Sequence, residues 1–269
     1  MKKKALALAL LGAMVLTTFT GCGSTTKTAS NDGGGKGDTT VTFIPTVTGN
    51  AFFESANKGA QKYAEKWGFK VKYEGDATAS ASSQVSVINK AVQQGTNAIC
   101  LSSVDAAGVK DALKAAAAAG VTVTTWDSDV DPSVRKIMVS QGTPEQLGQM
   151  LVQMSCDSLK DRGKDPAKDK IKYCWHYSNA TVTDQNSWQV EGEKYIKANY
   201  PNWENVAPTN YYSNQDAEQA ISVGESVLSA HPDIDVIICN DSTALPGQAQ
   251  AAQNKGLTAK DVTITGFAS

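Results

Sequence analysis

The stretch from residue 98 to residue 126, AICLSSVDAAGVKDALKAAAAAGVTVTTW, decides the fold class. It begins with an apolar run (98–101), continues with an alanine-rich segment (109–119) that stops at Gly120, and closes with a run of valine and threonine that ends at Trp126 (121–126). The two runs have the length of buried strands, and a glycine directly after a periodic segment is typical of a helix end. A strand, a helix and a strand in this order predict a parallel β-α-β unit.

Strands and helices alternate in the same way along the rest of the folded sequence. The pattern restarts near Gln141, where Thr143-Pro-Glu-Gln146 supplies a helix N-cap, a proline at the first helical position and a capping-box glutamine. We therefore predict an α/β fold of two doubly wound parallel-sheet lobes, 41–140 and 141–269, with a hinge and a cleft between them. The predicted strands are 41–45, 69–73, 98–101, 121–126, 136–139, 171–176, 206–212, 233–239 and 262–266, and the predicted helices are 52–67, 84–94, 109–119, 144–160, 186–199, 216–230 and 246–254.

The first forty residues have the composition of an export signal followed by a tether. Lys2 to Lys4 precede an uncharged, mostly apolar segment (5–20), which is shorter than the ~20 residues of a membrane-spanning helix and typical of a signal peptide. The segment ends in Phe19-Thr-Gly-Cys22, which is similar to a bacterial lipobox except that Phe19 stands where leucine is usual. We predict a signal peptide (1–21), lipidation of Cys22 and a flexible tether (22–40); the alternative is an ordinary secretory signal with an incidental cysteine.

The composition excludes several classes of protein. The 269 residues are 41% hydrophobic, enough for one large domain or two medium ones. Removal of 1–21 changes the net charge from −2 to −5, so neither nucleic acid nor anionic lipid is an expected partner. The chain has no P-loop, GxSxG or Rossmann glycine pattern, and we predict neither an enzyme nor a cofactor. Two histidines and five cysteines match no metal pattern, and Cys100, Cys156, Cys174 and Cys239 are expected to be small buried hydrophobes.

Polar and aromatic side chains gather where the predicted strands end. Ligands of open α/β sheets bind at the carboxyl ends of the strands, so these side chains should meet in the cleft. Carboxylates accept hydroxyl hydrogen bonds, amides both donate and accept, and aromatic faces pack on a small ring. This chemistry indicates recognition of a sugar or polyol without catalysis. The candidate residues are Thr46, Phe52, Phe53, Trp126, Asp127, Asp184, Gln185, Asn240, Asp241 and Ser242.

Several of these residues also have a structural explanation. For Asp184 and Asp241 the alternative interpretation is a helix N-cap, and Asp105 is expected to be a cap. One of the two phenylalanines is expected in the core, and His176 is read as a core histidine near the end of a buried strand. His231 needs no function. We expect packing roles for Trp67, Trp188 and Trp203, and Ala60, Tyr63, Ala64 and Trp67 share one stripe of the first helix.

Several short segments together resemble the type I periplasmic-binding-protein family, most of all its Lsr-type autoinducer-2 receptors and the neighbouring rhamnose-binding proteins. The resemblance spans 41–269 and implies an exported or lipid-anchored receptor that closes around its ligand and delivers it to the permease of an ABC transporter. Family members have a further C-terminal segment. The resemblance therefore also implies that this sequence is C-terminally incomplete and lacks hinge strands and an aromatic wall of the pocket. The matching segments are Phe43-Ile-Pro45, Gly49, Phe52-Phe53, Trp126-Asp-Ser-Asp129, Gln141-Gly-Thr-Pro144, Thr181-Val-Thr-Asp-Gln-Asn186 and Trp188.

The resemblance also implies a ligand and roles for individual residues. Asp127, Asp184 and Gln185 would bind the hydroxyls of a furanosyl polyol, with Phe52 and Phe53 beside its ring. The expected ligand is autoinducer-2 in its tetrahydroxy furanosyl form, and the alternative is rhamnose or a pentose. Three positions depart from the Lsr pattern: Thr46 replaces a lysine, and Asn240 and Ser242 replace a proline and an alanine.

Two other classes of protein fit this sequence less well than a receptor. A sugar-responsive transcription regulator shares the two-lobed core but needs an N-terminal helix-turn-helix, where residues 1–40 offer a signal and a tether instead. A hydrolase is disfavoured because no base is positioned beside a nucleophile.

Overall fold

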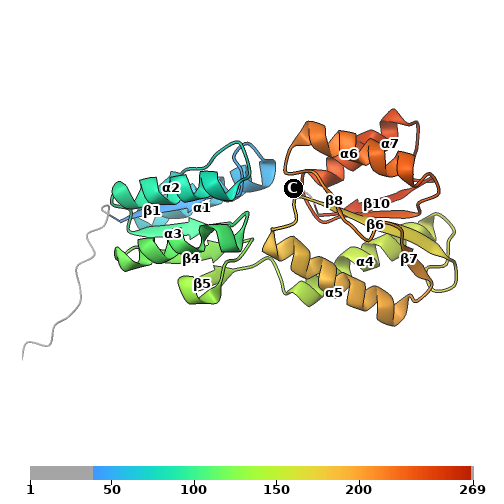
Figure 1. The fold of residues 1–269 in the computed structure, drawn as a ribbon, viewed down its shortest axis with the longest axis horizontal. Helices are drawn as coiled ribbons and strands as arrows, with labels where there is room; N and C mark the ends of the chain where they lie inside the picture. The colour runs from blue at the N-terminus through green and yellow to red at the C-terminus, as the bar shows by residue number, and fades with distance from the viewer. Residues whose placement is uncertain (1–38, 268–269) are drawn as a thin grey trace, which may run out of the picture. The chain divides into compact units, whose positions relative to one another are not determined.

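The computed structural model describes residues 39–267 (Figure 1). The predicted signal peptide, Cys22 and nearly all of the predicted tether lie outside the described residues. Within them, no helix combines the length and the apolar character that a membrane span requires.

The first half of the described chain folds around a five-stranded sheet. Its elements are β1 (Thr40–Ile44), α1 (Ala51–Trp67), β2 (Lys70–Tyr73), α2 (Ala81–Gln93), β3 (Ala98–Leu101), α3 (Ala106–Ala118), β4 (Thr122–Trp126), the short 3-10 helix η1 (Pro132–Val134) and β5 (Ile137–Val139). The strand order is β2-β1-β3-β4-β5, and every pair is parallel. Ile44, Ile99 and Leu101 are fully buried and share one core with Ile88 of α2 and Leu113 of α3.

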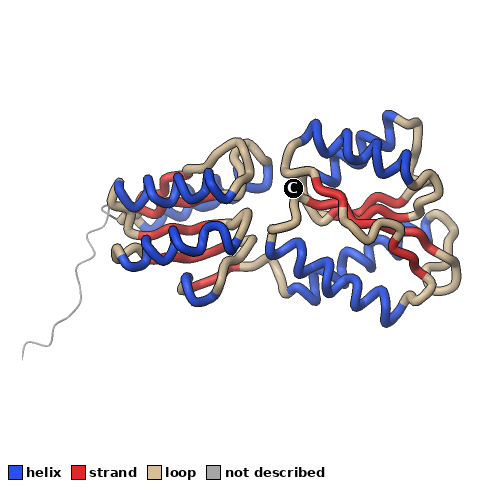
Figure 2. Tube along the Cα trace, viewed as in Figure 1, coloured by secondary structure: helices blue, strands red, loops and turns tan. Residues whose placement is uncertain are grey.

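The second half builds another parallel sheet with helices on both faces. Its elements are α4 (Pro144–Asp161), β6 (Ile171–Tyr177), α5 (Thr183–Asn199), β7 (Trp203–Asn205), β8 (Tyr211–Tyr212), α6 (Ala217–Ala230), β9 (Val236–Cys239), α7 (Ala244–Asn254) and β10 (Thr263–Gly266). The order is β10-β9-β6-β7, and β8 also pairs with β6. Helices α4 and α5 cover one face, and α6 and α7 cover the other (Figures 1 and 2).

Alternation along β6 explains why both faces of this sheet are covered. Trp175 packs with Ile238 in the core under α4 and α5, whereas Cys174 packs with Ile237 in the core under α6 and α7. Since successive side chains of a strand point to opposite faces, a strand that is buried along nearly its whole length, as β6 is, must be covered on both sides. The predicted doubly wound α/β fold is therefore confirmed.

The start of α4 has the predicted capping box. The Thr143 hydroxyl accepts a hydrogen bond from the Gln146 backbone N–H (3.3 Å), and the Gln146 side chain accepts one from the Thr143 N–H (3.1 Å). Pro144 occupies the first helical position. This cap fixes where the chain leaves the first half and enters the second.

Two of the predicted elements between β6 and α6 are wrong in position. The strand expected over 206–212 is absent except for β8, because Pro208 has no N–H for a sheet ladder and the Asn205 side chain accepts the Ala207 N–H in a turn. Helix α5 begins at Thr183 rather than Asn186, since the Asn186 N–H already donates to the Val182 carbonyl. Asp184 and Gln185 consequently lie in the first turn of a helix.

The aromatic part of the predicted stripe on α1 is also wrong. Ala64 is buried, but Tyr63 and Trp67 are 57% and 65% exposed, and Phe53 provides the large buried side chain of this helix. Tyr63 lies about 100° around the helix from Ala64, and Trp67 is the last helical residue. The Lys66 ammonium lies over both exposed rings (5.9 and 5.5 Å to their centroids), so these aromatic faces contact a cation instead of a core.

Candidate functional site

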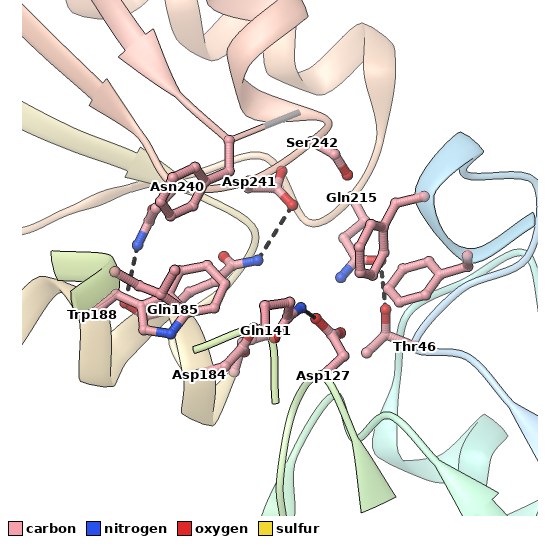
Figure 3. A pocket seen from close by; sticks show the side chains of 15 residues that line it. Thr46, Asp127, Gln141, Asp184, Gln185, Trp188, Gln215, Asn240, Asp241 and Ser242 are labelled. Carbon is pink, nitrogen blue, oxygen red and sulfur yellow. Dashed lines mark hydrogen bonds between the residues drawn. The ribbon is translucent and has the colours of Figure 1, made fainter. Parts of the chain in front are cut away.

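A cavity of about 200 Å³ lies where strand ends from both sheets meet (Figure 3). Nine of the ten candidate residues line it, and Trp126 is the exception. The lining residues are Thr46, Phe52, Phe53, Asp127, Gln141, Leu147, Val182, Asp184, Gln185, Trp188, Gln215, Asn240, Asp241, Ser242 and Phe267.

Asp127 follows β4 in a strained backbone conformation. Its φ of 59° lies in the left-handed region, which costs a non-glycine residue about 1–3 kcal/mol. Ser102 donates to Oδ2 (2.7 Å) and Gln141 donates to Oδ1, so both carboxylate oxygens are held. Burial raises the pKa of Asp127 to about 6, although these two hydrogen bonds oppose the increase. Each oxygen retains a lone pair for a ligand hydroxyl.

Asp184 lies in the first turn of α5 and is buried. The helix N-cap is Val182, so the alternative interpretation of Asp184 as a cap is wrong. Its Oδ1 has no hydrogen-bond partner among the described residues. Burial raises the pKa of Asp184, and the neighbouring Asp127 charge raises it further. A buried carboxylate oxygen without a partner is costly unless a ligand supplies a donor.

Gln185 and Asp241 are hydrogen-bonded to each other and to neighbouring protein groups. The Gln185 side-chain oxygen accepts from the Ser178 N–H and hydroxyl (both 2.9 Å), and its nitrogen donates to Asp241 Oδ1 (3.4 Å). The other Asp241 oxygen accepts the N–H groups of Thr243 (3.1 Å) and Ala244 (2.8 Å). Asp241 thus accepts N–H groups at the start of α7, whose N-cap is Thr243, while it lines the cavity, and burial raises its pKa.

Two aromatic groups supply the apolar walls. Phe52 and Phe53 meet edge to face (centroids 5.1 Å apart), and Trp188 and Phe267 meet in the same way (5.7 Å). The proposed pocket position of Trp126 is not what the structure shows, because this ring stacks on Phe43 (4.6 Å) behind the phenylalanine pair. Trp188, predicted as a packing residue, belongs to both the core and the cavity wall.

The three positions that depart from the Lsr pattern all have protein partners. The Thr46 hydroxyl donates to the Gln215 side-chain oxygen (3.0 Å). Ser242 accepts a hydrogen bond from the side-chain amide of Asn50 (3.3 Å). The Asn240 side-chain nitrogen donates to the Gln185 carbonyl (2.9 Å), while its oxygen is buried without a partner in the described chain.

Six lining residues are not among the candidates chosen from the sequence: Gln141, Leu147, Val182, Trp188, Gln215 and Phe267. Gln141 and Phe267 follow predicted strands, so the strand-end rule would have found them. Gln215 lies three residues beyond the end of β8, in an irregular turn where it and Asn214 both have positive φ, so the strand-end rule points to it only weakly.

The remaining titratable candidates lie away from this cavity. His176 is buried and its Nδ1 faces the Gln248 side-chain oxygen (3.2 Å); burial lowers the pKa of this histidine to about 4. Within residues 39–267, no group of three or more histidine, cysteine or acidic side chains is arranged to hold a metal ion. Cys156, Cys174 and Cys239 are free and buried, as predicted, and Cys100 is half-buried.

Known proteins have related sequences and structures. The model of the periplasmic binding protein domain matches residues 41–269. The structure of LsrB from Clostridium saccharobutylicum in complex with AI-2 is 90% identical, covering 86% of this chain and 71% of that chain, with a TM-score of 0.85. An ABC transporter solute binding protein from Clostridium phytofermentas with bound L-rhamnose is 25% identical (86% and 68% covered, TM-score 0.78).

A curated relative points to the same family. The ribose import binding protein RbsB of Bacillus subtilis (strain 168) is 25% identical over 271 residues, which are 98% of this chain and 81% of that protein. These relatives are solute-binding receptors of transport systems, and the chain belongs to the periplasmic binding protein domain family, with the type I fold of two parallel-sheet lobes.

Proposed function

We propose that this chain is the substrate-binding protein of an ABC importer and that it binds autoinducer-2, in the tetrahydroxy furanosyl form, within the cavity. The observation that carries the proposal is the buried, unpartnered oxygen of Asp184 beside Asp127, in a small cavity with apolar walls. The 90% identity to a structure with bound AI-2 supports the choice of ligand.

The arrangement favours a small, flat polyol. Asp127 and Asp184 accept hydroxyl hydrogen bonds, which are about twice as strong as neutral ones when the carboxylate is ionised. Gln185 and Asp241 hold the α5 and α7 ends of the site in place. The rings of Phe52 and Trp188 pack on the carbon side of the ligand.

We propose no catalytic role for these carboxylates. Asp127 and Asp184 lie beside amides and aromatic rings, and no side chain in the cavity lining is an activated nucleophile. Binding and release, with the two lobes closing around the ligand, account for every polar residue of the site.

Rhamnose or a pentose is the second candidate ligand. Thr46, Asn240 and Ser242 stand where Lsr-type receptors carry other residues, and one structural neighbour holds L-rhamnose. The cavity chemistry suits any small sugar with adjacent hydroxyls, so the ligand has to be identified by measurement.

The same proposal covers the N-terminal region and the lobe boundaries. We infer a signal peptide (1–21), lipid attachment at Cys22, a tether (22–40), and lobes of 41–140 and 141–269 that deliver ligand to a permease. Radiolabelled palmitate should label the wild-type protein in a bacterial host but not Cys22→Ala. Equal labelling of both would contradict lipidation.

The ligand is tested with the protein itself. Protein purified from autoinducer-2-containing medium is denatured, the released ligand is assayed, and calorimetry is run against autoinducer-2, rhamnose and pentoses. We expect released autoinducer-2, and Asp184→Ala should abolish binding while the matched surface variant Asp111→Ala binds normally. Rhamnose binding without autoinducer-2 release would establish the second candidate, and full affinity in Asp184→Ala would refute the site.

A further inference from the structure

Hydrogen-bond donors are scarce in the cavity. Three aspartates line it, and ionised carboxylates only accept. The nitrogens of Gln141, Gln185 and Asn240 each already donate to a protein acceptor. A sugar hydroxyl or ring oxygen also has lone pairs, so a complementary site needs free donors as well as acceptors.

Two lining side chains have a nitrogen that donates to no acceptor among residues 39–267. They are the indole of Trp188 and the side-chain amide of Gln215, and they lie on opposite sides of the cavity (Figure 3). The indole offers one N–H in the plane of a ring that is packed into the core. The Gln215 amide offers two N–H groups on the side where Thr46 lies.

The Gln215 amide is held in one orientation. Thr46 is buried and its hydroxyl donates to the side-chain oxygen of Gln215, which leaves the nitrogen for the cavity. The acidic lining favours the same orientation, because N–H groups are attracted to carboxylates and the amide oxygen is repelled. In Figure 3 the amide reaches from the Ser242 side toward Thr46 and the centre of the cavity.

Hydrogen bonds also hold the backbone around Gln215 in place. Asn214 and Gln215 have φ of 51° and 58°, and such left-handed residues persist only where their surroundings hold them. The N–H of Ser213 donates to the Tyr177 carbonyl (2.9 Å) and the N–H of Asn214 to the Ser178 carbonyl (2.6 Å). The turn is therefore anchored to the end of β6, beside the cavity.

We propose that Gln215 is a ligand-binding residue that donates to an oxygen of the bound polyol, and that Thr46 is its positioning residue. The inference rests on the proposed function and extends it to the donor side of the site. Thr46 follows β1 of the first sheet and Gln215 follows β8 of the second, so the donor is oriented only when both lobes contribute. The hydrogen bond from Thr46 therefore couples ligand recognition by Gln215 to the closure of the two lobes.

The test is a double-mutant cycle measured by calorimetry with autoinducer-2. Gln215→Met keeps the length and volume of the side chain, and we expect Kd to rise about 5- to 10-fold, as for the loss of one neutral hydrogen bond. Thr46→Val should raise Kd about 2- to 4-fold, and the double variant should bind like Gln215→Met alone. The exposed Gln253→Met is the matched control, with unchanged Kd.

A second substitution separates ligand contact from simple lobe bridging. Gln215→Glu still accepts from Thr46 but offers no donor, so a ligand-binding role predicts a larger loss of affinity than with Gln215→Met. Gln215→Met binding within twofold of wild type, additive single variants, or full affinity in Gln215→Glu would each overturn the inference. If the wild type binds a sugar instead of autoinducer-2, the proposed ligand fails, and the same cycle with that sugar still tests Gln215.

Discussion

Ligand affinity should fall as the pH is lowered through about 6, because burial raises the pKa of Asp127 to that value. Hydroxyl recognition uses the ionised carboxylate, so the apparent Kd increases by the factor by which protonation depletes that form. Between pH 7.5 and pH 5.0 this amounts to about a tenfold increase. Asp184 and Asp241 face the same cavity and also have raised pKa values. Their protonation at low pH therefore makes the loss of ligand affinity steeper and does not reverse it.

The assay is calorimetry in matched buffers across this pH range, with circular dichroism to show that the fold persists. Asp127→Asn is the companion variant, with weaker binding at pH 7.5 and less change in Kd between the two pH values. A wild-type Kd that changes less than twofold from pH 7.5 to 5.0 would refute the reasoning.

The unliganded protein should show the opposite trend in stability. The pKa of Asp127 is higher in the folded state (about 6) than its ordinary value of 3.8, so the folded state binds the proton more tightly. The contribution of this residue to the free energy of unfolding therefore increases as the pH falls from above 6 toward 3.8, by up to about 3 kcal/mol. The difference between wild type and Asp127→Asn in urea unfolding isolates this contribution, and a difference that does not depend on pH would contradict it.

Three further changes test the supports of the site. Gln84→Leu removes the side chain that donates to the carbonyls of Pro45 (2.9 Å) and Ser102 (2.7 Å), so the free energy of unfolding should fall by roughly 2–4 kcal/mol in urea titration; a loss below 1 kcal/mol would contradict this role. Gly148→Ala places a methyl group against the Trp188 carbonyl of α5, so it should displace α5, lower the thermal midpoint and weaken binding. A thermal midpoint equal to that of the wild type would show that the helices adjust freely. Asn50→Ala removes the hydrogen bonds to the loop before α7, so Kd should rise a few-fold and the unliganded radius of gyration in X-ray scattering should increase; no change in either would show that this contact does not favour closure.

The repeating fold could be predicted because apolar runs and helix stops are local signals. The 98–126 unit and the Thr143 capping box follow from residues that are adjacent in sequence. The expected 206–212 strand was wrong because residue types alone do not show which N–H groups find a sheet partner. The predicted packing of Tyr63 and Trp67 was wrong for a similar reason, since periodicity indicates that residues share a helix face but not what covers that face.

The candidate site was predictable to the extent that parallel strands end together. Asp127, Asp241 and Asn240 directly follow strands, and the fold alone brings them to one edge. The hydrogen bonds that Asp241 accepts at the start of α7 and the unpartnered oxygen of Asp184 depend on where each helix begins, which sequence spacing fixes only within a few residues. Gln215 depends on two consecutive left-handed residues, for which neither asparagine nor glutamine gives a reliable signal.

The parallel pairing of all the described strands has a consequence for how fast this chain folds. Neighbours in the sheets are distant in sequence: Val41 pairs with Ala98, and Tyr173 pairs with Val236. Such high contact order makes folding slow, since long loops must close before any ladder forms. For a chain that crosses a membrane before it folds, as the proposed export signal requires, slow folding keeps the polypeptide unfolded during translocation. The topology that assembles the ligand site would thereby also delay folding until the protein reaches the compartment where its ligand is found.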